Sequence, residues 1–151
     1  MNSPALIRTL AILALAFSLG SYSSMITLAP VWISRFPVGT LLRGALGLTF
    51  AVLGWSGFLW LVLAFVLLSL TPQMRLRFFG SHAIPLPGVL GASAMLAGIW
   101  VIGIVPLTGA LARAGHRLQT LFILSHLLSV ACVVAIVALE IWGMSALTRM
   151  S

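Results

Sequence analysis

Four long apolar stretches, separated by short segments that contain arginine or proline, dominate this sequence. Each is long enough, at about 20 residues or more, to cross a bilayer core of roughly 30 Å as an α-helix. Backbone groups in lipid must bond within their own segment, so such runs are helices; the short alternating segments of a membrane barrel are absent. We predict a single all-α domain over residues 1–151, a bundle of transmembrane helices spanning residues 5–29, 45–70, 89–111 and 118–147.

The first stretch begins like a secretory signal peptide, with Arg8 ahead of an apolar run and small residues after it. The apolar run continues to about residue 29, which is longer than a typical signal core. We therefore expect it to be retained as the first span.

Prolines and polar residues predict where the spans are interrupted. We expect Pro30 to end the first span and Pro106 to kink or unwind the third, because proline lacks a backbone N–H and clashes with the preceding turn. Short turns are expected at residues 35–37 and 113–117. The connection between the second and third spans is too rich in proline to be helical throughout, and it contains Arg75, Arg77, His82, Pro85 and Pro87.

Composition agrees with a membrane protein, since 62% of the residues are hydrophobic and 6% are charged. The net charge of +7 comes from eight basic residues and one acid. All eight are arginines at segment ends, without interleaved stacking aromatics, so we interpret them as interfacial anchors and exclude nucleic acid as a partner.

The arginines do not orient the chain in the membrane. With four spans, one side of the membrane would receive Arg8, Arg75, Arg77 and Arg149, and the other would receive Arg35, Arg43, Arg113 and Arg117. At four against four, the positive-inside rule favours neither orientation.

Small residues recur at helical spacing and predict faces where helices pack closely. They are Gly44, Gly47, Ala51, Gly54 and Gly57 in the second span, Gly91, Ala94 and Gly98 in the third, and a hydroxyl stripe of Ser18, Ser21 and Ser24 in the first. We expect these faces to pack inside the bundle, with docking to another subunit as the alternative.

Two ionisable residues fall inside spans, where such groups are costly and become functional candidates. They are His126 and Glu140, 14 residues apart in the fourth span. At 100° per residue, both share one helix face with Ser129, Val133 and Val137. The separation, about 21 Å along the axis, excludes a direct acid–base pair.

Each of these residues has a structural and a functional interpretation. His126 could be a neutral imidazole bonded to a neighbouring helix, or a ligand of haem or a metal. Glu140 could pair with Arg75 or Arg149 at the interface, or serve as a proton or cation site.

Cofactor sites have weak support in the residue pattern. A bis-histidine haem site lacks a second intramembrane histidine, because the others lie in loops. Soft ligands that would suit copper form no motif; they are Met25, Met95, His126 and Cys132. The mid-span residues Trp55, Trp60 and Trp100 could contact a pigment, quinone or lipid, or simply fill space.

An independent enzyme is not expected. The chain has one carboxylate side chain and no aspartate, which excludes paired-carboxylate mechanisms and a Ser-His-Asp set. It also lacks a phosphate-cradling glycine loop and a zinc-helix motif.

Several short motifs resemble a bacterial four-helix membrane family of unknown function, whose eukaryotic relatives are the transmembrane proteins linked to cisplatin resistance. The motifs are LAFSLG at 15–20, LAPV at 28–31, FP at 36–37, VPL at 105–107 and LSHLLS at 124–129. The resemblance implies four spans in a bacterial inner membrane and singles out Pro30, Pro106 and His126. It implies no biochemical activity.

We therefore expect a non-catalytic accessory or assembly subunit of a larger membrane complex, with respiratory and photosynthetic complexes as examples. The glycine faces and mid-span tryptophans would supply the helix or pigment contacts. One alternative is a small oligomeric transporter or channel that uses Glu140 and His126. The other is a haem- or copper-binding membrane protein.

Overall fold

The computed structural model describes residues 3–35, 41–70, 75–78, 82–114 and 118–149. The elements are α1 (Ser3–Arg35), α2 (Leu41–Ser69), β1 (Arg75–Phe78), β2 (His82–Pro85), α3 (Leu86–Gly98), η1 (Ile99–Ile104), α4 (Val105–Arg113) and α5 (Gln119–Arg149). Four helical stretches are long and apolar enough to cross a membrane: Pro4–Leu28, Leu48–Ser69, Leu86–Leu111 and Gln119–Arg149. The prediction of an all-α bundle with four candidate transmembrane helices is confirmed.

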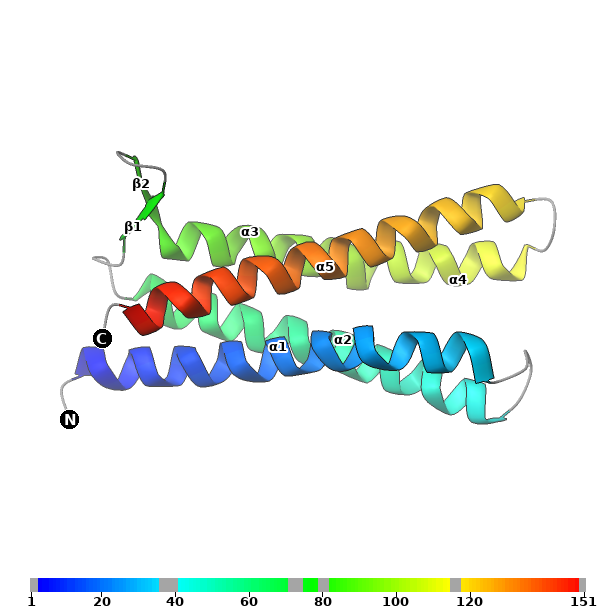
Figure 1. Cartoon of the computed structure of the whole chain (residues 1–151), viewed down its shortest axis with the longest axis horizontal. Helices are drawn as coiled ribbons and strands as arrows, with labels where there is room; N and C mark the ends of the chain where they lie inside the picture. The colour runs from blue at the N-terminus through cyan, green and yellow to red at the C-terminus, as the bar shows by residue number, and fades with distance from the viewer. Residues whose placement is uncertain (1–2, 36–40, 71–74, 79–81, 115–117, 150–151) are drawn as a thin grey trace.

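The helices lie side by side along the long axis of the molecule and alternate in direction (Figure 1). Helix α1 packs against α2 and α5, and α3 packs against the same two helices. The chain thus forms two helical hairpins, α1–α2 and α3–η1–α4–α5, and both termini lie at the end of the bundle that carries β1 and β2 (Figure 1). At the opposite end, α4 and the start of α5 diverge from the first hairpin (Figure 1).

The first span extends further than predicted. Helix α1 continues through Pro30 to Arg35, where we expected the first span to end. Proline costs one hydrogen bond in a helix interior, but its fixed φ is helical, and the loss is tolerated in membrane helices. Residues 36–40 and 115–117, which include two of the expected turns, lie outside the described residues.

Pro106 changes the winding of the third span without ending it. The segment η1 is a π-helix, in which the Val105 N–H donates to the carbonyl of Trp100, five residues earlier. Pro106 follows directly and cannot donate an α-helical bond, so the wider turn accommodates its missing N–H. The third span is irregular next to Pro106, but the irregularity is a wider turn before the proline; the predicted early unwinding is wrong, because α4 continues to Arg113.

The connection between the second and third spans contains a short antiparallel hairpin that we did not predict. Strands β1 and β2 pair from Arg75 opposite Pro85 to Phe78 opposite His82. The expectation that this segment is not helical throughout is confirmed for these residues.

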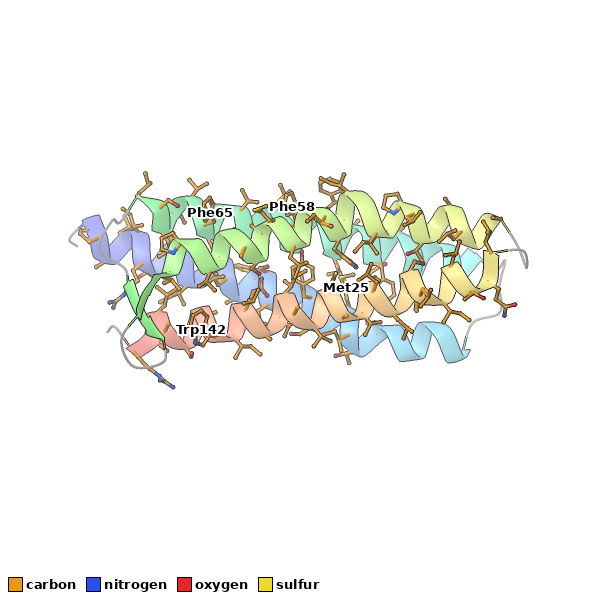
Figure 2. The ribbon with its side chains drawn as sticks, turned by 90° about the horizontal axis from the view of Figure 1, so that it is seen from above. Met25, Phe58, Phe65 and Trp142 are labelled. Atoms are coloured by element: carbon orange, nitrogen blue, oxygen red, sulfur yellow. The ribbon has the colours of Figure 1, made fainter. Side chains whose placement is uncertain are left out.

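Glycines let aromatic rings pack between the helices. Gly54 lies under the ring of Trp100 and Gly57 under that of Tyr22, while Gly91 and Gly98 of α3 receive Phe65 and Phe58 of α2. Figure 2 places Phe58 and Phe65 where α2 runs beside α3. Since lipid offers no hydrophobic drive for helix association, these close contacts contribute the packing energy of the bundle. The predicted small-residue faces pack internally at these positions.

Candidate functional site: a buried carboxyl at the seam of two hairpins

Glu140 is fully buried in the interior of the bundle. It lies nine residues before Arg149, the last residue of α5, which corresponds to about 13 Å along the helix axis. The residue that it contacts, Ser18, lies near the middle of α1, so the carboxyl lies well inside the bundle and away from its ends. The carboxyl therefore does not lie at the end of the bundle, where the first of our two interpretations paired it with Arg75 or Arg149.

Ser18 of α1 is the hydrogen-bond partner of this carboxyl. Its hydroxyl contacts Oε1 of Glu140, and it also lies 2.9 Å from the carbonyl oxygen of Gly57 on α2. Ser18 is fully buried as well. The Ser18 hydroxyl thus connects α1, α2 and α5 at the level of Glu140. Through this hydroxyl the two hairpins are joined.

The predicted serine stripe of α1 is wrong for its other members. Ser21 donates to the carbonyl of Phe17 and Ser24 to that of Gly20, both within α1. A serine in a helix can bond the carbonyl four residues earlier, so only a buried position facing another helix predicts a cross-helix bond.

Tyr22 borders the site one turn beyond Ser18. Its side chain is fully buried, and its hydroxyl has no hydrogen-bond partner among the described residues. The ring covers Gly57 and meets the ring of Trp100 edge-on, with centroids 6.0 Å apart. A Cβ atom at Gly57 would lie 2.7 Å from Cε2 of Tyr22, so the glycine is required for this ring position.

Two further buried oxygens near this level have no hydrogen-bond partner among the described residues. They are the second carboxyl oxygen of Glu140, Oε2, and Oγ of Ser93 on α3. Leu90 packs over Gly143, and α3 runs antiparallel to α5. Ser93 lies three residues after Leu90 on α3, and Glu140 lies three residues before Gly143 on α5. Because the two helices are antiparallel, Ser93 and Glu140 lie at similar depth. Native interiors leave few polar atoms unbonded, so these oxygens mark the region as specialised.

A second polar cluster lies between Glu140 and the diverging end of the bundle. The indole Nε1 of Trp100, in η1, donates to Oγ of Ser129 at 2.7 Å. Nearer that end, Oγ1 of Thr108 lies 3.2 Å from Oγ of Ser125. Ser129 and Ser125 lie 11 and 15 residues before Glu140 on α5, about 16 and 22 Å along the axis.

His126 lies on α5 beside this second cluster. Its ring is half-buried and stacks on Phe122, with centroids 6.0 Å apart and planes at 26°. The predicted face of α5 that contains Ser129, Val133 and Glu140 points into the bundle toward its carboxyl-terminal end, where Val133 and Glu140 are buried. The structure therefore does not bring His126 and Glu140 together.

The residues considered for cofactors do not converge on one site. No group of three or more His, Cys, Asp or Glu side chains that could hold a metal occurs among the described residues. Of the possible copper ligands, Met25 and Cys132 are buried, while Met95 is 71% exposed on the outside of the bundle.

The three mid-span tryptophans also separate. Trp100 is buried at the bundle centre, Trp60 stacks on Phe17 at a centroid distance of 5.0 Å, and Trp55 is 46% exposed. Trp55 and Trp60 help to line a shallow apolar groove on the outer face of α2. A cofactor held by all three rings is therefore excluded in this arrangement.

Sequence reasoning named Glu140, and it named Ser18 and Gly57 as parts of packing faces, but it did not connect the three and it missed Tyr22 and Ser93. Tyr22 is the only tyrosine of the chain and lies four residues after Ser18, on the same helix face. That spacing, combined with the position of Gly57 in a small-residue face, was the available signal. No family model, curated protein or solved structure matches this chain.

Proposed function

We propose that this protein is a small carrier or channel of the inner membrane that moves a cation across the bilayer, with Glu140 as its binding group. The observation that carries the proposal is a fully buried carboxyl well inside the bundle, bonded to a hydroxyl from the other hairpin. A charged or ionisable group at this depth is costly, so its retention in a chain with no other acidic side chain calls for a role.

The second polar cluster supports a direction of access. The Trp100–Ser129 pair lies between Glu140 and the end where the hairpins diverge, and the Thr108–Ser125 pair lies closer to that end. Polar side chains inside a membrane bundle are the usual lining of an ion pathway. We therefore expect the cation to reach Glu140 from the end near residues 114–118.

Flux into proteoliposomes tests the proposal directly. Purified protein should carry a proton or alkali-cation current under an imposed gradient, and Glu140→Gln should reduce it at least about tenfold, because the amide cannot alternate between charged and neutral forms. Ser18→Ala should also reduce flux, since it removes the partner of the carboxyl.

Ser21→Ala is the matched control, because Ser21 lies three residues after Ser18 and donates to Phe17 within its own helix. Flux that persists unchanged in Glu140→Gln, or that Ser21→Ala lowers as much as Ser18→Ala, would refute the proposal. His126→Ala, a residue that the structure separates from Glu140, should affect flux less than Glu140→Gln.

The accessory-subunit hypothesis is the second candidate. The glycine faces support this hypothesis less than the sequence suggested. Side chains of this same chain cover Gly54, Gly57, Gly91 and Gly98, so these glycines are not available to a partner helix. The groove on α2 that contains Trp55 and Trp60 still offers an apolar surface to a lipid tail, a pigment or a partner helix. Recovery from native membranes within a larger particle, without cation flux in the isolated protein, would favour this candidate.

A further inference from the structure

We propose that the cation at Glu140 is a proton, which the carboxyl holds as a neutral acid in a chain of two hydrogen bonds that ends on the Gly57 carbonyl. This inference rests on the proposed function and specifies the ion. The sequence of donors would be Glu140 to Ser18, then Ser18 to Gly57, across the seam between the hairpins.

Proton counting at Ser18 supports this chain. A serine hydroxyl has one proton to donate, and it lies within bonding distance of two oxygens, those of Gly57 and Glu140. A carbonyl and an ionised carboxylate can only accept, so an ionised Glu140 would leave one of the two contacts without a hydrogen. A protonated Glu140 supplies the missing hydrogen, and both contacts become hydrogen bonds.

The charges around the carboxyl agree with a neutral acid. Tyr22 is the titratable side chain that borders it from α1, and the described side chains of α2 (48–69) and of α3 include none. On α5, Cys132 and His126 lie eight and 14 residues before Glu140. An ionised carboxylate buried without a cation is strongly unfavourable, which favours the protonated form.

The basic residues with described side chains are distant from the site. Arg8 lies ten residues before Ser18 on α1, about 15 Å along the axis, and Arg149 lies nine residues beyond Glu140. Neither arginine lies within one helical turn of the carboxyl along the helix axis. A bound proton is therefore the positive charge that neutralises the carboxylate.

A metal cation fits the contacts less well. Hard cations bind several oxygen ligands at once and would separate the oxygens of Ser18 and Glu140, which are in direct contact. The unbonded oxygens of Tyr22 and Ser93 could serve as further ligands, so sodium is the competing outcome that the experiment must distinguish.

Infrared spectroscopy can observe the proton, because Glu140 is the single acidic side chain of the sequence. Cell-free synthesis with isotope-labelled glutamate would place the label at one position. In lipid at neutral pH, we expect an isotope-sensitive band of a neutral carboxylic acid that is absent from Glu140→Gln and is replaced by carboxylate bands at alkaline pH. Ser18→Ala should move this band to higher frequency, since the acid loses its acceptor, whereas Ser21→Ala should leave it in place.

Carboxylate bands alone at neutral pH would overturn the inference. Replacement of the acid band by carboxylate bands on addition of sodium, but not of choline, at constant pH would identify a metal cation and leave the proposed cation transport intact. An acid band together with no flux in proteoliposomes would leave the proton assignment standing and refute the transport function. The wild-type isotope difference suffices even where a variant fails to fold.

Discussion

At the scale of single residues, the interior of this protein depends on glycines, which have no Cβ atom, and on the charge state of the buried polar side chains. Gly57 permits the ring of Tyr22 to lie against α2, and this ring closes one side of the region that contains Ser18 and Glu140. The polar site and the aromatic–glycine packing are therefore parts of the same layer of the bundle.

Substitution of Gly57 tests this coupling. In Gly57→Ala the new methyl group would meet Cε2 of Tyr22 at 2.7 Å, and the rigid ring would have to shift. We expect a loss of about 1–3 kcal/mol in unfolding free energy, as for overpacked cores. Denaturant titration in mixed micelles would measure it.

Gly20→Ala is the control for this prediction, because no atom lies within 4 Å of a Cβ at Gly20. It should be neutral, or stabilising by up to about 1 kcal/mol through helix propensity. Equal losses in both variants would show that the Tyr22 contact is not the cause.

At the scale of elements, the third span is composite: α3, then the π-helical η1, then α4. The π-turn changes the angular register of the residues on either side of it. The ring of Trp100 in η1 packs on Gly54 of α2, and its N–H donates to Ser129 of α5, so this segment positions the ring between α2 and α5.

Removal of the Ser129 hydroxyl tests the contact between η1 and α5. Ser129→Ala leaves the Trp100 N–H without its acceptor. We expect a loss of about 0.6 kcal/mol, the average for hydrogen bonds between membrane helices, and of at most about 1.7 kcal/mol. Ser145→Ala is the matched control, because Ser145 donates to Trp142 within α5. If both variants unfold at the same denaturant concentration, the Trp100–Ser129 bond contributes no stability.

At the scale of the whole molecule, an even number of spans returns the chain to its starting side. Both ends of the chain lie at the end of the bundle that carries β1 and β2 (Figure 1). If all four helices span a bilayer, Ser3 and Arg149, the first and last described residues, lie on the same side of it, although the arginine distribution does not say which.

Cysteine labelling tests this topology. In a Cys132→Ala background, which has no other cysteine, a single cysteine added at either terminus should react with a membrane-impermeant thiol reagent from the same side of intact cells. Reaction from opposite sides would contradict the four-span arrangement. The original Cys132 is buried and should stay unlabelled.

The sequence predicted the spans well because lipid imposes length and apolarity on each helix separately. It also placed Glu140 on one helix face with Val133, which follows from the period of one helix, but it did not decide between the interface and the interior for the carboxyl. It did not predict Ser18 as the partner of Glu140, since the two are 122 residues apart and their meeting depends on how four helices pack. Pro30 was misjudged for a related reason: a local rule treats proline as a helix end, while the membrane environment favours continued helical bonding around it.

The bond between Ser18 and Glu140 crosses the boundary between the α1–α2 hairpin and the α3–η1–α4–α5 hairpin, whereas the Ser18–Gly57, Trp100–Ser129 and Thr108–Ser125 contacts each stay within one hairpin. Departure of a proton from Glu140 would leave the single hydrogen of Ser18 to be shared between a carboxylate and a carbonyl, and the charged acceptor is the stronger of the two. The hydroxyl would turn from Gly57 to Glu140, so the two halves would stay joined while α1 and α2 lose a bond inside the first half.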